Sequence, residues 1–66
     1  MRASYKKLWK ILIDKDMTKT DLRKSIGVSS ATIAKMTNGE DVSMAVIMKI
    51  CSLLNCDIGD IVEIVR

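Results

Sequence analysis

A glycine between two short helical patterns is the feature that most constrains the fold of this chain. The first pattern, Lys19 to Ile26, stops at Gly27, and the second runs from about Ser30 to Thr37. Glycine closes a helix because it adopts a positive φ without strain, and it lets two helices cross closely. Two helices joined in this way form a helix-turn-helix, whose second helix enters the major groove of DNA. Sequence-specific DNA binding is therefore the leading hypothesis.

Apolar residues in this segment fall only where two packed helices would bury them. They are Leu22, Ile26, Val28, Ile33 and Met36. The helix starts are also marked, since Thr18 with Asp21 resembles a capping box and Ser29 can cap the second helix. An arbitrary helical hairpin meets some of these conditions but seldom all, so the combination favours a helix-turn-helix.

Helical periodicity on either side predicts three further helices. The first extends from a Ser4 cap to about Lys15, the fourth from a Ser43 cap to about Leu54, and a short fifth covers Ile58 to Val62. The apolar side of the first contains Tyr5, Leu8, Trp9, Leu12 and Ile13. We therefore expect an all-α, compact five-helix domain over residues 1–66, a single helix-turn-helix DNA-binding domain.

The apolar end of the chain, Ile61 to Val65, leaves several alternatives open. It can fray, pack on the core, or form a short terminal strand that pairs either with Arg2 to Ser4 or with a second copy. Exposed apolar tails on small domains are typical of dimerisation.

Charge is divided unevenly along the 66 residues, whose net charge is +3. Residues 1–39 carry nine basic and three acidic side chains, a net charge of +6, whereas residues 40–66 carry two basic and five acidic ones, a net charge of −3. Such a dipole can orient on a polyanion, although a solvated surface explains the charges equally well.

Several function classes have little support in the composition. Cys51 and Cys56 lack further ligands for zinc because the chain has no histidine, and we expect both thiols to be reduced. The chain has no glycine-rich phosphate loop, and no general base accompanies its serines, so these patterns give no support to catalysis. We expect no enzyme activity, no metal, no cofactor and no small-molecule ligand. The lack of a spanning segment or signal peptide favours a cytoplasmic protein without membrane contact.

The chain resembles the lambda-repressor-like, or XRE/Cro-type, regulators. The resemblance rests on TKTDLRKSIGVSSATIAKMTNG, followed by VSMAVIMKICSLLNCDIGDI, and covers about Tyr5 to Ile61. It implies a fold of five short helices in which the second and third form the DNA-reading pair. The chain also resembles, more narrowly, the VanU type, the small accessory regulators found with glycopeptide-resistance gene clusters.

The geometry of a helix in the major groove predicts which side chains read bases, because its first turn faces the base edges. Hydroxyls can donate or accept at several bases, small methyls suit thymine, and lysine can donate to guanine O6 and N7. The predicted base-reading residues are Ser30, Ala31, Thr32 and Lys35. For the two hydroxyl residues the competing interpretation is ordinary capping and solvent exposure.

The resemblance also implies phosphate contacts, from Thr18, Lys19, Ser29 and Asn38. The chain departs from the family at Arg23, where a small residue is usual, at Lys19, where glutamine is frequent, and at Thr37, where many members have glutamate. Arg23 would have to turn outward past the third helix, toward a phosphate or a carboxylate. These departures affect individual contacts more than the fold.

Double-stranded DNA is the expected partner, bound by two copies on a pseudo-palindromic site because one recognition helix offers little contact. The alternative function is a protein-interaction module, either antitoxin-like or the accessory partner of another regulator. Its working surface would then be the acidic second half and the tail from Ile61 to Val65.

Overall fold

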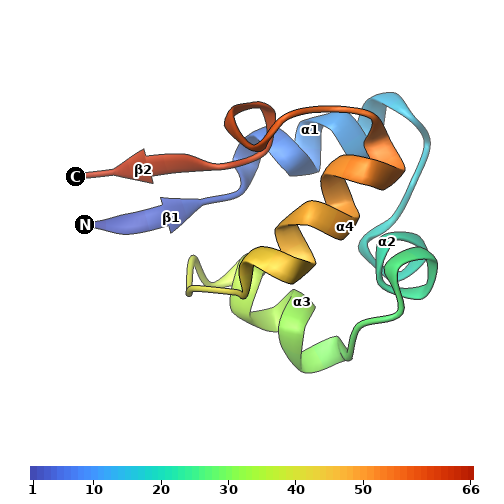
Figure 1. Cartoon of the computed structure of the whole chain (residues 1–66), viewed down its shortest axis with the longest axis horizontal. Helices are drawn as coiled ribbons and strands as arrows, with labels where there is room; N and C mark the ends of the chain where they lie inside the picture. The colour runs from blue at the N-terminus through green and yellow to red at the C-terminus, as the bar shows by residue number, and fades with distance from the viewer.

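The computed structural model describes all 66 residues, and its secondary structure is mostly helical (Figure 1). In chain order the elements are β1 (Arg2–Ser4), α1 (Lys6–Asp14), α2 (Lys19–Ile26), α3 (Ser30–Thr37), α4 (Met44–Leu54), the 3₁₀ turn η1 (Ile58–Asp60) and β2 (Glu63–Val65). None of these helices combines the length and the apolar character needed to cross a membrane.

Short-range signals in the sequence set most helix boundaries. The hydroxyls of Thr18, Ser29 and Ser43 each accept a hydrogen bond from an amide three residues later, which caps α2, α3 and α4. Gly27 closes α2 in the left-handed conformation with φ of 68°. Asn55 closes α4 in the same region with φ of 52°, which asparagine tolerates better than most residues.

The prediction of five helices is wrong, because the structure has four α-helices. The fifth predicted helix, Ile58 to Val62, is reduced to the single 3₁₀ turn η1. Asp57 and Asp60 cap each other at its start, with the Asp60 carboxylate 2.9 Å from the Asp57 amide. Gly59 in its middle disfavours a longer helix, and the β-branched residues beyond Ile61 extend into β2 instead.

The first helix also differs from the prediction at its start and on one flank. Ser4 belongs to β1, so α1 begins at Lys6 with Tyr5 as its cap residue and without a side-chain cap. Ile13 was predicted to be buried but is 71% exposed. Ile11 packs against the core instead, because its position on the helix lies closer to the line through Leu8.

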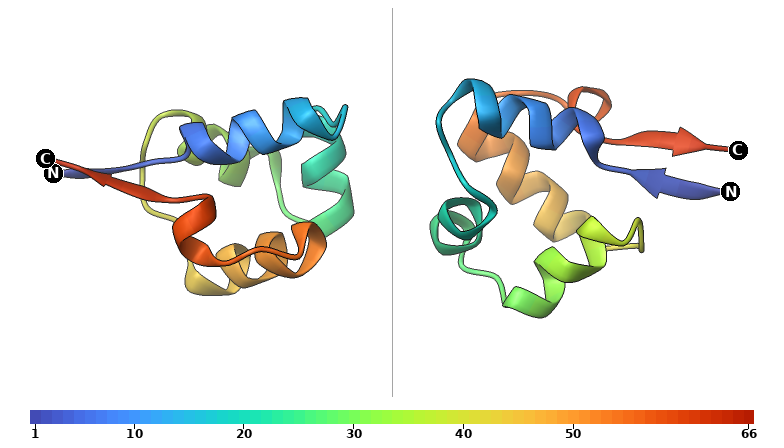
Figure 2. Two further views of the ribbon diagram at one scale, coloured as in Figure 1. Left: turned by 90° about the horizontal axis from the view of Figure 1, so that it is seen from above. Right: turned by 180° about the vertical axis from the view of Figure 1, so that it is seen from behind.

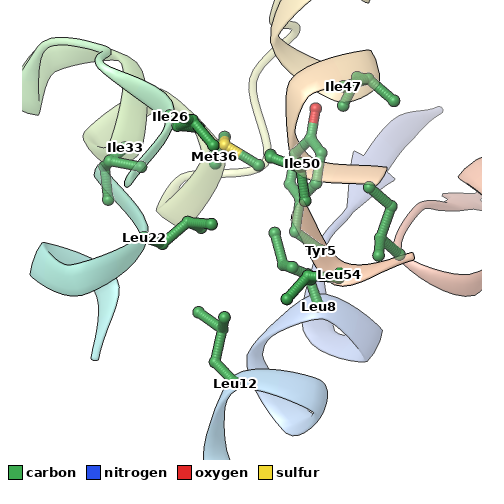
Figure 3. Close-up of a cluster of buried hydrophobic side chains, with 11 residues drawn as sticks. Tyr5, Leu8, Leu12, Leu22, Ile26, Ile33, Met36, Ile47, Ile50 and Leu54 are labelled. Carbon is green, nitrogen blue, oxygen red and sulfur yellow. The ribbon is translucent and has the colours of Figure 1, made fainter. Parts of the chain in front are cut away.

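The core lies where the four helices and the segment after η1 meet. Its residues are Tyr5, Leu8, Leu12, Leu22, Ile26, Ile33, Met36, Ile47, Ile50, Leu54 and Ile61, and Figure 3 shows most of them converging. Each helix contributes at least two, so α2 and α3 cannot move independently of α1 and α4. This shared core fixes the angle at which α3 is presented to solvent.

The two ends of the chain form a small antiparallel sheet that extends away from the helices (Figures 1 and 2). Its register pairs Arg2 with Val65, Ala3 with Ile64 and Ser4 with Glu63. The structure combines two of the alternatives left open by the sequence, because Ile61 packs in the core and Glu63–Val65 pair as a strand with Arg2–Ser4. Both termini lie side by side at the free end of this sheet.

Candidate nucleic-acid interface

One side of α3 is held against the rest of the molecule, and the other side is free. Ile33 and Met36, three residues apart, are buried with Leu22 and Ile26 of α2 (Figure 3). Gly27 serves the turn between the two helices through its φ of 68°, and the expected close crossing at this glycine is absent, because a Cβ there would meet nothing within 4 Å. The packing therefore fixes which residues of α3 face outward.

The free side of α3 carries three of the four predicted base-reading residues. Ser30, Ala31 and Lys35 are exposed, and Ala34 lies with them at helical spacing. Ala34 was not among the predicted base-reading residues, although it belongs to this exposed stripe. The spacing from Ser30 and Ala31 was the signal that could have found it.

Thr32, the fourth predicted base-reading residue, is turned toward the cap of its own helix. It is half-buried, and its hydroxyl lies 3.2 Å from the Ser29 hydroxyl. The Ser29 oxygen also accepts from the Thr32 amide, at 3.3 Å. The two side chains thus form a local pair at the start of α3, and the structure separates Thr32 from the exposed stripe.

Thr18 and Asp21 form a reciprocal cap at the start of α2. The Thr18 hydroxyl accepts from the Asp21 amide at 3.1 Å, and the Asp21 carboxylate accepts from the Thr18 amide at 2.9 Å. The hydrogen bond from the Thr18 backbone, followed by that from its side chain, holds the pKa of Asp21 below its usual value. The carboxylate is therefore charged and already bound at this helix end.

Lys19 joins three helices near the start of α2. Its ammonium lies 4.3 Å from the centre of the Trp9 ring on α1, within the range of a cation–π interaction. The same ammonium donates to the Thr37 hydroxyl on α3 at 3.1 Å, and that hydroxyl donates to the Ile33 carbonyl at 3.0 Å. Sequence reasoning identified Lys19 but not these partners, which come from distant positions of the chain.

Asn38, the last predicted phosphate contact, ends α3 beside a polar groove. Arg2, Lys6 and Trp9 line the same groove from β1 and α1. Gly39 follows with φ of 72°, and its Cβ position would lie 3.0 Å from the Ala3 carbonyl oxygen. The structure therefore brings two cations from the start of the chain to the end of α3, a juxtaposition that sequence spacing does not indicate.

Arg23 was expected to turn outward past α3. It is half-buried on α2 and lines a shallow hollow between α2 and α3, together with Ser30 and Ile33. Lys19 and Thr20 complete the lining from the start of α2. Two of these five residues are cations and none is acidic, so the hollow is bordered by basic side chains alone.

Comparison with known proteins gives two findings. Residues 7–66 match the model of the Cro/C1-type HTH DNA-binding domain family. Among solved structures, the chain is similar to the crystal structure of the transcriptional regulator VanUg, with 56% sequence identity and a TM-score of 0.91. That similarity covers 94% of this chain and 83% of the other. A search of curated proteins gave no match.

Proposed function

This chain belongs to the Cro/C1-type helix-turn-helix DNA-binding domain family, and we propose that it is a transcriptional regulator that reads the major groove with α3. The observation that carries the proposal is the division of α3, whose buried Ile33 and Met36 hold it in place while Ser30, Ala31 and Lys35 stay free. The similarity to a transcriptional regulator over most of both chains supports the regulatory role.

Base recognition is assigned to the first turns of α3. Ser30 offers a hydroxyl that can donate or accept, Ala31 a methyl group that suits thymine, and Lys35 a donor for guanine O6 and N7. Because the hydroxyl of Thr32 pairs with Ser29, we assign to Thr32 a contact through its methyl group only. We therefore expect α3 to read few base pairs. Lys35 would supply a charged donor, Ser30 a hydroxyl, and Ala31 and Thr32 methyl contacts.

Phosphate contacts are assigned to residues whose polar atoms keep a free donor. Lys19 uses one of its three ammonium hydrogens on Thr37 and keeps two. The Ser29 hydroxyl accepts a hydrogen bond in its cap and keeps its hydrogen available if Thr32 donates to it. The Thr18 hydroxyl accepts from the Asp21 amide and also bonds the Asp21 carboxylate, so it can donate to a phosphate only by turning its hydrogen away from that carboxylate. Asn38 has an exposed amide at the end of α3. Such contacts position the protein but carry no sequence information.

Two copies are proposed to act together on DNA. One eight-residue recognition helix contacts few base pairs, and a pair of copies doubles the reading surface. A symmetric pair would bind half-sites about 34–36 Å apart, one helical turn of DNA. Native mass spectrometry of the complex with a selected duplex tests this, and one copy per duplex would reject it.

Salt dependence tests DNA binding itself. Binding to a duplex selected from a random pool should weaken as salt rises, with a logarithmic slope of about −0.9 for each phosphate contacted. A flat response to salt, or no binding at low salt, would remove DNA as the partner and leave protein interaction as the remaining function.

Lys35→Ala tests the base readout. If Lys35 reads guanine, the variant should lose about 1–3 kcal/mol on the selected duplex and discriminate less at one base position. Binding to duplexes that carry each single base change measures this. Lys7→Ala is the matched control, since the Lys7 ammonium bonds the Gly59 carbonyl at 3.3 Å, on η1 and away from α3 (Figure 1). An equal loss on every duplex would make Lys35 a phosphate contact.

A further inference from the structure

Arg23 has no partner within the chain although it is half-buried. None of the side-chain hydrogen bonds in the structure involves its guanidinium. A guanidinium carries five donors in a planar fork, and its hydrocarbon stem can lie along a neighbouring helix while the head stays in water. Arg23 lines the hollow beside α3, and the chain itself uses none of its donors.

The hollow that Arg23 lines is suited to an anion. Lys19 stands at its other end on α2, so two positive charges border it and no carboxylate does. Of the remaining lining residues, Thr20 and Ser30 offer hydroxyls and Ile33 is buried in the core. A guanidinium without a partner, in a hollow that no carboxylate borders, favours an anion over a cation.

The position of the hollow relates it to the proposed recognition helix. Lys19 reaches Thr37 near the end of α3, whereas Arg23, one turn further along α2, lies beside Ser30 at the start of α3. When a recognition helix enters the major groove, the preceding helix crosses the sugar–phosphate backbone. Arg23 then faces the backbone that borders the bases reached by the first turn of α3.

We propose that Arg23 binds a DNA phosphate with its guanidinium fork, at the edge of the groove that Ser30 enters. This inference rests on the proposed function, because it needs α3 to lie in DNA. Arginine suits the role since its fork matches the oxygens of a phosphate in a bidentate contact, which lysine cannot reproduce. The contact adds affinity without sequence preference and holds the start of α3 in register.

Salt titrations of Arg23 variants test the inference. The probes are a duplex selected by the wild-type protein and a shuffled duplex of the same length and composition, with binding followed by fluorescence anisotropy. Arg23→Ala should reduce the logarithmic salt slope by about 0.9 for each copy bound, and weaken both duplexes by the same factor. Arg23→Lys should keep the slope but bind less tightly, because the charge remains and the fork is lost.

Lys7→Ala serves as the matched control, since it also removes one positive charge but at the far side of the molecule from α3 (Figure 1). Its slope should stay close to that of the wild type. Urea unfolding of each variant shows whether it is folded, and if Arg23→Ala is not, Arg23→Gln provides the same test with a polar side chain.

Three outcomes would overturn the inference. An Arg23→Ala slope equal to that of Lys7→Ala would show that Arg23 touches no phosphate. A loss on the selected duplex alone would make Arg23 a base contact. In both cases the wild type still binds DNA and the proposed function stands. Failure of the wild type to bind either duplex rejects the proposed function and this inference together.

Discussion

Two regions of this molecule differ in the sequence separation of the contacts that hold them. The helical pair, residues 18–37, contains α2, the Gly27 turn and α3, and its boundaries depend on hydrogen bonds between residues three positions apart. The terminal clasp consists of β1, Tyr5, β2 and residues 38–41, and its contacts join positions far apart in the chain. Tyr5, for example, donates from its hydroxyl to the Glu40 carbonyl at 3.2 Å.

The difference assigns a role to each region. The helical pair forms the proposed reading surface once its apolar side packs on the core that it shares with α1 and α4. The terminal clasp instead positions the end of α3, because Ala3 lies against Gly39 and Tyr5 bonds the next residue. Changes in the pair should therefore act through local conformation, and changes in the clasp through the fit of distant segments.

The largest expected loss of stability comes from replacing Gly39, and it should exceed the loss at Gly27, which also has a positive φ. Gly27→Ala should destabilise the fold by about 1–2 kcal/mol, the strain of a left-handed residue with a Cβ. Gly39→Ala should destabilise it by about 2–4 kcal/mol, because its Cβ would also press on the Ala3 carbonyl at 3.0 Å. Urea unfolding at neutral pH measures both.

Asparagine at the same two positions sharpens this comparison, since it tolerates a positive φ but still carries a Cβ. Gly27→Asn should recover most of the lost stability, and Gly39→Asn should not. Equal recovery at both positions would mean that the Ala3 carbonyl moves aside without resistance and that the clasp does not constrain Gly39.

Removal of the cap on α2 should have the next largest effect. Thr18→Ala should destabilise the fold by about 1 kcal/mol, because the Asp21 amide loses its acceptor. Ser43→Ala removes an equivalent cap from α4 and should cost a similar amount. If Thr18 also holds a phosphate, only Thr18→Ala should weaken DNA binding, as measured by anisotropy under conditions in which both variants are folded.

Tyr5→Phe tests the clasp by removing one hydroxyl. The lost hydrogen bond to Glu40 should destabilise the fold by about 1 kcal/mol at neutral pH. Burial, aided by the negative charge of Asp41, raises the pKa of Tyr5 above its usual value. Its stabilisation is therefore complete below the ordinary phenol pKa of about 10 and declines as the pH rises through the raised value.

The difference in unfolding free energy between wild type and Tyr5→Phe, followed from neutral to strongly alkaline pH, isolates this contribution. That difference should shrink in alkali. A constant difference would show that the Tyr5 hydroxyl titrates as it does in the unfolded chain, and that the clasp leaves it in contact with water.

Acid should destabilise the helical pair by protonating the Asp21 carboxylate, and this loss of stability should be the smallest of those predicted. The pKa of Asp21 is lowered by its hydrogen bonds from Thr18, so its stabilisation is present above the ordinary aspartate pKa of about 3.9 and is lost as the pH falls through the lowered value. Asp21→Asn should lack this part of the acid dependence. Identical acid unfolding of the two proteins would contradict a role for the carboxylate in the cap.

Much of this fold can be predicted from residues that lie close together in the sequence. The four α-helices, the caps at Thr18, Ser29 and Ser43, and the turn at Gly27 depend on residues within one helical turn of each other. Apolar periodicity predicts the helices, and the cap and glycine residues predict most of their ends. The fifth helix was predicted wrongly because its pattern is only five residues long, and helical spacing cannot be told from a turn followed by a strand over so short a stretch.

The candidate site divides in the same way. The exposed residues of α3 follow from its apolar period, whereas the contacts of Lys19 with Trp9 and Thr37, and the approach of Arg2 to Asn38, join positions up to 36 residues apart. No local pattern encodes such neighbours. They arise when the shared core sets the angles between helices and brings the two chain ends together.

The sequence by itself determined that α2 and α3 form, where each begins and ends, and which side of α3 is apolar. The tertiary structure alone decided that the two termini pair as a sheet, that this sheet abuts the end of α3, and that Arg23 is left without a partner in a basic hollow. The physical reason is that helix formation depends on groups three or four residues apart, whereas these contacts depend on how the packed core orients distant segments.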